Sequence, residues 1–335
     1  MISSEPQLEE FLSAPSETDV QALARLEGDL LILGVAGKMG PSLARRAKRA
    51  CPRKRVIGVA RFSDPAARRK LEEAGVETVQ ADLLDPGALA QLPSAANVIH
   101  MAARKFGSTG NEHLTWAMNT LLPGLVCERF RDSRIVVFST GNVYPLTPVA
   151  LGGPVETSPV GPVGEYAQSA LGRERICQYY SDRYKTPVTL LRLNYAVELR
   201  YGVLLDIGRK VFGRQPVDVT MGYVNVIWQG DANSVALRAF TLAQSPPAVL
   251  NVTGPEALSV RSAARRFADR FGMEPVYQGM ESDSALLSNA ARCHSLLGVP
   301  SVTVEQMIEW TADWIASGGA TLDKPTHFEV RDGRF

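Results

Sequence analysis

Short, uninterrupted apolar runs alternate with amphipathic segments along the first part of the chain. An apolar run of this kind is typical of a parallel strand buried on both faces, and the segments between the runs have helical periodicity. The alternation predicts an α/β fold with a doubly wound, Rossmann-like parallel sheet. We expect strands at 29–33, 55–60, 77–80, 97–101, 134–139 and 188–193, and helices at 41–50, 65–74, 86–92, 112–130 and 166–184.

The regular alternation ends near residue 194, which suggests three parts. Residues 1–28 are predicted to form an N-terminal extension with one short helix, capped by Ser16 and Asp19. Residues 29–194 form the α/β lobe. Residues 195–335 form a smaller mixed lobe, some segments of which return to the first. We expect short strands there at 223–227 and 249–252, and helices at 231–244, 259–271 and 304–316.

A glycine-rich segment follows the first predicted strand directly. Its first glycine permits a tight turn, the second lets the backbone approach a pyrophosphate, and the third lets the next helix pack closely. The common fingerprint has one residue between the first two glycines, whereas this chain has two. Strand, glycine loop and helix together predict that the segment binds a dinucleotide through Gly34, Gly37, Lys38, Met39 and Gly40.

Two further positions bear on the identity of the dinucleotide. An acidic residue after the second strand would bind the ribose 2′-hydroxyl of NAD, but Arg61 stands there. Because arginine accommodates a 2′-phosphate, we favour NADP over NAD. In the alternative, the Arg61 side chain is solvated, and Asp64 is the acidic residue that binds the ribose 2′-hydroxyl of NAD. Asp82 and Leu83 follow the third strand and are expected to contact the adenine end of the dinucleotide. In the alternative, Asp82 only caps the helix that starts at Pro86.

Composition excludes several classes of function. The 36 Lys and Arg residues balance 35 Asp and Glu, so the formal net charge is +1 and a dominant nucleic-acid role is not expected. The four cysteines are dispersed, which predicts reduced thiols and no metal site. No apolar run approaches the roughly 18 residues that span a bilayer, and no signal peptide is evident. We expect a cytoplasmic protein that does not bind membranes.

Four segments, taken in order, resemble the extended short-chain dehydrogenase/reductase superfamily in its NAD-dependent epimerase/dehydratase branch. They are the glycine loop 34–40 and the segments 98–103, 136–145 and 165–170, and the resemblance extends over roughly residues 29–255. It implies an NAD(P)-dependent enzyme that acts by hydride transfer on a carbohydrate-like or hydroxy/keto substrate, such as a sugar or sugar nucleotide. It also implies a homodimer that packs helices 112–130 and 166–184 between subunits.

The resemblance assigns roles to individual residues. Thr140 takes the place of the catalytic Ser/Thr, and Tyr166 that of the catalytic Tyr. A hydroxyl at the carboxyl end of a parallel strand lies where such sheets bind ligands, and a tyrosine can exchange the proton that accompanies hydride transfer. The remaining cofactor contacts are expected from Met101, Ala102, Ala103 and Lys105, and the substrate contacts from Asn142, Asn194, Tyr195 and His113.

One departure from the family pattern concerns the catalytic lysine. Four residues after Tyr166, where the family has lysine, this chain has Ala170, and only eight lysines occur in all. Without that cation, we expect Tyr166 to be a better proton donor than base. Lys105 is the best candidate for a replacement, whereas Arg173 and Arg175 are expected on a helix face or dimer surface. The departure also motivates an alternative function, an NAD(P)-binding redox sensor or partner-binding protein with little turnover.

Overall fold

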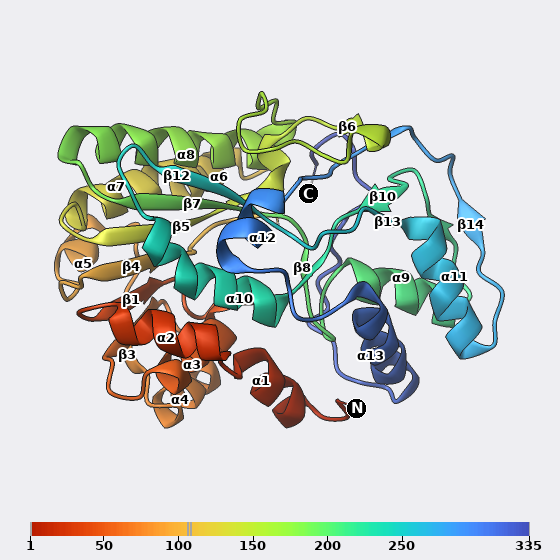
Figure 1. Ribbon diagram of the computed structural model, residues 1–335, viewed down its shortest axis with the longest axis horizontal. Helices are drawn as coiled ribbons and strands as arrows, with labels where there is room; N and C mark the ends of the chain where they lie inside the picture. The colour runs from red at the N-terminus through yellow and green to blue at the C-terminus, as the bar shows by residue number, and fades with distance from the viewer. Residues whose placement is uncertain (1, 106, 108, 335) are drawn as a thin grey trace.

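The computed structural model, which describes residues 2–105, 107 and 109–334, contains the parallel sheet that the apolar runs predict (Figure 1). Seven strands lie in the order β12-β7-β5-β4-β1-β2-β3, and every neighbouring pair is parallel. The fold-class prediction is therefore confirmed. The strands are β1 (Leu30–Leu33), β2 (Val56–Ala60), β3 (Glu77–Gln80), β4 (Asn97–His100), β5 (Arg134–Thr140), β7 (Val188–Leu193) and β12 (Ala248–Val252).

Helices cover both faces of the sheet because alternate residues of each strand point to opposite faces. Leu30 and Ile32 of β1 pack in one buried cluster, and Leu31 and Leu33 pack in another. The first cluster is covered by α2 (Glu17–Arg25), α3 (Gly40–Ala50), α4 (Pro65–Glu73), α10 (Gln229–Arg238) and α12 (Ala291–Leu297). The second is covered by α5 (Pro86–Ala90), α7 (Leu122–Arg129) and α8 (Gly164–Tyr184).

A separate apolar cluster lies among the later elements of the chain. It joins α9 (Val203–Phe212), α11 (Val260–Phe271) and α13 (Val304–Ala316). Within the described residues, eight short strands form four separate two-stranded sheets in the same part of the chain and before it. They are β6 (Thr147–Pro148), β8 (Ala196–Val197), β9 (Val217–Asp218), β10 (Tyr223–Val224), β11 (Ile227–Trp228), β13 (Leu258–Ser259), β14 (Tyr277–Gln278) and β15 (Ser284–Ala285).

The single helix predicted at 112–130 is interrupted. It consists of α6 (Glu112–Trp116), a π-helical segment (Ala117–Leu121) and α7. Pro123 explains the change, because it has no N–H for the carbonyl of Asn119 and its ring crowds that carbonyl. Arg173 of α8 occupies the vacated position, since its Nε donates to the Asn119 carbonyl at 3.2 Å.

The prediction that Arg173 lies on a helix face or dimer surface is therefore wrong. Its side chain is buried, and its Nη1 donates to the Phe138 carbonyl at 2.6 Å. Burial lowers the pKa of this guanidinium. Arg175, two residues further along α8, is exposed as expected.

The N-terminal extension contains two helices rather than the one predicted. α1 (Glu5–Ser13) precedes Pro15, and α2 begins after Ser16 with the predicted capping box, in which Ser16 and Asp19 exchange hydrogen bonds. A residue before proline disfavours helical backbone, which separates the two. Because apolar side chains of α1 and α2 are buried against the fold, the extension is part of the packed structure.

Asp19 also anchors the extension through a buried ion pair. Its carboxylate accepts hydrogen bonds from Arg46 Nε at 2.7 Å, from Ser234 Oγ at 2.6 Å and from the Ser16 N–H at 2.9 Å. Burial alone would raise the pKa of Asp19, but Arg46 and these hydrogen bonds outweigh it and hold that pKa below its usual value. The capping residue thus links α2, α3 and α10.

The four cysteines, Cys51, Cys127, Cys177 and Cys293, carry free thiols. Among the described residues, no group of three or more His, Cys, Asp or Glu side chains could hold a metal ion. Within the same part of the chain, no helix is both long and apolar enough to cross a membrane.

Asp19→Asn should destabilise the protein by about 3–5 kcal/mol at pH 7, because it leaves Arg46 buried without its counter-charge. The loss should appear as a lower urea midpoint. Since the pKa of Asp19 is lowered in the folded state, its contribution is present above about pH 4 and disappears as pH falls through that lowered pKa. Glu10→Gln, which removes the exposed Arg49 pair, should cost less than about 1 kcal/mol. If both variants lowered the urea midpoint equally, the role of Asp19 as the buried anchor of the extension would be contradicted.

Candidate active site

A cavity of about 130 Å³ lies at the carboxyl ends of β5 and β7. It brings together residues that are far apart in the sequence, because carboxyl ends of parallel strands meet at one edge of a sheet. Predicted site residues on its walls are Lys38, Met39, Lys105, Thr140, Asn142, Tyr166, Asn194 and Tyr195. Ser139, Leu193, Ala196, Val197, Tyr201, Gly202, Val203 and Thr326 complete the lining. His113, a predicted substrate contact, is exposed on α6 and is not among the lining residues.

Thr140 is held at the end of β5 by a tight turn. Its Oγ1 accepts the N–H of Asn142 at 3.2 Å and donates to Asn142 Oδ1 at 3.1 Å. Gly141 allows the close approach of Asn194, since a Cβ at residue 141 would lie 3.2 Å from the Asn194 side chain. The turn thus places Thr140, Asn142 and Asn194 on one wall.

A buried ion pair lies directly beneath this wall. Glu174 of α8 accepts hydrogen bonds from Arg192 Nη2 at 2.7 Å and from Ser139 Oγ at 2.6 Å. Arg192 Nη1 donates to the Tyr144 hydroxyl at 2.7 Å, and that hydroxyl lies 2.8 Å from Asn251 Oδ1. Burial would lower the pKa of Arg192, but Glu174 outweighs it and raises that pKa. The network ties α8, β5, β7 and β12 together around the cavity.

Tyr166 enters the cavity from the first turn of α8. It is buried and lines the same cavity as Thr140. One turn further along, Ala170 is completely buried and packs with Val143 and Tyr144. The space around residue 170 is therefore apolar and filled.

Two lysines reach the cavity from other segments. Lys38 Nζ donates to the Ala196 carbonyl at 3.1 Å and lies 3.6 Å from the centre of the Tyr201 ring. Lys105 Nζ donates to the Thr326 carbonyl at 3.5 Å. Burial of the ammonium groups lowers the pKa of Lys38 to about 7 and that of Lys105 to about 8, despite the opposing effects of Glu198 and Asp206 respectively.

The glycine loop has the geometry that a dinucleotide requires. Gly34 has φ +90°, and a Cβ there would lie 2.7 Å from the Ala102 nitrogen, while a Cβ at Gly40 would collide with the Val35 carbonyl. Gly37 is exposed in this loop, and the side chain of Lys38, the next residue, reaches the cavity. No side chain caps the start of α3, and the N–H of Gly40, its first residue, donates to the Gly37 carbonyl at 3.2 Å. These residues fit a bound pyrophosphate.

The structure also places the residues expected at the adenosine end. Arg61 is exposed just after β2. Asp64 accepts the Ala66 N–H at 2.8 Å and caps α4. Asp82 is exposed and accepts the Leu84 N–H, whereas Asp85 caps α5, so Asp82 is not the helix cap considered as its alternative role.

The remaining residues that are predicted to contact the cofactor lie just after the ends of β3 and β4. Leu83 is buried after β3, and beyond β4 Met101 and Ala102 are half-buried while Ala103 is exposed.

Sequence reasoning missed part of this site. One weak feature of the sequence could have identified Glu174 and Arg192 as a buried pair. Each is a charged residue at a position that the helical or strand pattern predicts to be buried. Tyr201 and Thr326 carry no local signal, because only the tertiary fold brings them to the cavity.

Comparison with known proteins gives one family match and several proteins of the same fold. The model of the NAD dependent epimerase/dehydratase family matches residues 30–197. Comparison with curated proteins gives no match. Solved structures with the same fold include Pal from Bacillus thuringiensis (20% identity, TM-score 0.72, 86% of this chain and 99% of that chain covered). They also include UDP-glucuronic acid 4-epimerase from Bacillus cereus in complex with NAD (17%, 0.71, 86% and 98%) and UDP-glucose 4-epimerase from Thermus thermophilus in complex with NAD (19%, 0.71, 85% and 98%).

Proposed function

The chain belongs to the NAD dependent epimerase/dehydratase family, and we propose that it is an NAD(P)-dependent enzyme acting by hydride transfer on a carbohydrate-like or hydroxy/keto substrate. The observation that carries the proposal is the cavity that Thr140 and Tyr166 share with two residues of the glycine loop, Lys38 and Met39. A bound nicotinamide would supply or accept the hydride. A dinucleotide on the glycine loop would then end beside these hydroxyl groups.

Each polar group of the cavity has a distinct part in this proposal. The Thr140 hydroxyl orients the substrate oxygen, and the Tyr166 hydroxyl exchanges a proton with it. Asn142, Asn194 and Tyr195 contact the substrate. Met101, Ala102 and Ala103 line the cofactor, and the lysine cations replace the one missing at Ala170.

The substrate is proposed to be a sugar or sugar nucleotide. Two of the structurally similar proteins named above are epimerases of UDP-linked sugars, which supports this class. We also propose a homodimer formed by 112–130 and 166–184, because the exposed apolar side chains Trp116, Leu121 and Tyr179 lie on these segments. Residues 29–194 would bind the cofactor, and residues 195–335 most of the substrate.

Tyr166→Phe should reduce turnover about 10²- to 10⁴-fold, because it removes the proton-exchanging hydroxyl while retaining the ring. Nicotinamide absorbance, followed with a panel of sugars and sugar nucleotides, measures this. Tyr277→Phe, the same change at a residue of β14 that does not line the cavity, should have no effect on turnover. If the unmodified protein binds the dinucleotide tightly but turns over no compound, the alternative holds, and the protein is an NAD(P)-binding sensor or partner-binding protein.

Arg61→Ala should weaken NADP binding about 10- to 100-fold and leave NAD binding nearly unchanged, since a charge-assisted bond to the 2′-phosphate would be lost. Asp64, the alternative ribose ligand, already caps α4, which supports the preference for NADP. Isothermal titration calorimetry with both dinucleotides tests this. Arg53→Ala, an exposed change before β2, is the control. An equal loss of affinity for both dinucleotides would refute the preference.

Ala170→Lys should lower activity rather than raise it. The added side chain has no space against Val143 and Tyr144, and overpacking of this kind costs about 1–3 kcal/mol. Gln168→Lys adds the same charge on the exposed side of α8 and should leave kcat unchanged. Higher activity of Ala170→Lys would instead identify a site that has merely lost its lysine.

A further inference from the structure

The C-terminal residues 325–333 are here called the strap, and Figure 1 shows the chain running from α13 back toward the centre of the molecule, where it ends. Thr326 of the strap lines the catalytic cavity. Thr326 is buried on the wall that it shares with Tyr166 and Lys105. The segment is polar, and it makes specific contacts along its length.

Thr326 connects two charged groups from distant elements. Its N–H and Oγ1 donate to Asp206 Oδ2 of α9, at 2.8 and 2.6 Å. Its carbonyl accepts the hydrogen bond from Lys105 Nζ at 3.5 Å. One strap residue therefore lies between the carboxylate of Asp206 and the ammonium of Lys105.

Contacts on both sides of Thr326 hold the strap in place. Phe328 is 1% exposed within the cluster formed by α9, α11 and α13. Arg331 donates to the Ser284 carbonyl at 2.8 Å and to Ser284 Oγ at 2.9 Å. Gly333 packs on Gly164, where a Cβ on either residue would collide with backbone. Because Gly164 begins α8, the strap contacts the helix that carries Tyr166.

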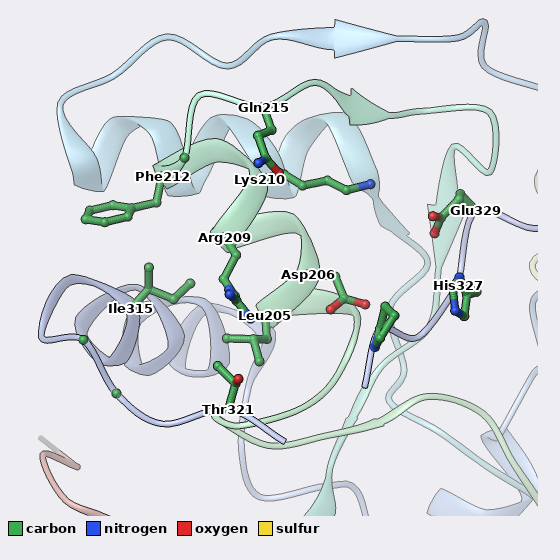
Figure 2. Close-up of a pocket in the computed structure, with 14 residues that line it drawn as sticks. Leu205, Asp206, Arg209, Lys210, Phe212, Gln215, Ile315, Thr321, His327 and Glu329 are labelled. Atoms are coloured by element: carbon green, nitrogen blue, oxygen red, sulfur yellow. The ribbon is translucent and has the colours of Figure 1, made fainter. Parts of the chain in front are cut away.

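The strap also separates two cavities. Pro325, His327 and Glu329 line an outer cavity of about 540 Å³, whereas Thr326 lines the inner, catalytic one. Figure 2 shows His327 and Glu329 beside Asp206 at one side of the outer cavity. The strap is therefore the wall that closes the catalytic cavity on this side.

We propose that Thr326 is a positioning residue that holds Lys105 at the catalytic cavity and closes the substrate side of that cavity. This inference rests on the proposed function, since it gives Lys105 a place beside the reacting groups. A lysine side chain has many rotamers, and a carbonyl on a fixed strap restricts them. The linkage to Asp206 fixes that carbonyl in turn.

The connection from Asp206 through Thr326 to Lys105 can be measured, because the charge of Asp206 affects the pKa of Lys105. Besides Lys105, the titratable groups that line the two cavities are Lys38 of the glycine loop, Tyr166 of α8, Tyr195 and Tyr201 after β7, Asp206, Arg209 and Lys210 of α9, and His327 and Glu329 of the strap. Burial raises the pKa of Asp206, and its hydrogen bonds from Thr326 oppose that rise. Without the Thr326 hydroxyl, Asp206 is less ionised and supports the charge of Lys105 less. The pKa of Lys105 should therefore fall.

Acetylation of Lys105 by acetic anhydride, followed by mass spectrometry across pH, tests this without turnover. Thr326→Val should increase labelling near pH 7 about threefold, which corresponds to a fall of about half a pKa unit, and Thr326→Ser should restore the original profile. Thr321→Val is the matched control, because the Thr321 hydroxyl bonds only to the nearby Asp323 in the outer region. Its profile should not change.

Turnover provides the second measurement. Thr326→Val should raise KM or lower kcat about tenfold through displacement of Lys105 and of the cavity wall, and Thr326→Ser should recover it. An unchanged labelling profile, or the same change in Thr321→Val, overturns the inference. A labelling shift in a protein without turnover supports the positioning role and refutes only the proposed function. If Thr326→Val does not fold, Asp206→Asn tests the same linkage, and the pKa of Lys105 should again fall.

Discussion

The buried pair of Glu174 and Arg192 is the interaction on which the arrangement of the site depends. Glu174 lies on α8 and Arg192 on β7, and both side chains are almost fully buried. An unpaired charge in such a place would be strongly destabilising, so the two elements can pack only in the register that joins them. Ser139 and Tyr144 add hydrogen bonds from β5 and from the turn after it. The pair thereby fixes the distance between the helix of Tyr166 and the strand of Thr140.

Ala170 stands on α8 at the position where the resemblance expects a lysine. Ala170 completes an apolar contact with Val143 and Tyr144, directly above the ion pair. The lysines that line the cavity come instead from other segments, Lys38 from the glycine loop and Lys105 from the segment after β4. A cation acts through its position and surroundings rather than its place in the chain, and the proposed function assigns these two lysines the part of the family lysine on this ground.

Several local features followed from sequence because their causes are local. The apolar runs became the strands of the sheet, the glycine loop adopted a backbone that only glycine accommodates, and Ser16 capped α2. The errors began with a local cause that had a long-range consequence. Pro123 opened the helix at 112–130, and the freed carbonyl of Asn119 drew Arg173 into the interior. His113 remained outside the cavity because α6 leaves it exposed.

The sequence by itself determined the α/β class, the succession of strands and helices along the chain, the glycine loop and half of the residues that line the cavity. These depend on periodicity and on backbone freedom, which are properties of neighbouring residues. Only the tertiary structure decided that Glu174 pairs with Arg192, that Asp19 binds Arg46, and that Thr326 lies between Asp206 and Lys105. Such pairings join residues from 18 to 221 positions apart, and they are selected by the cost of burying polar groups without partners, which no local pattern records.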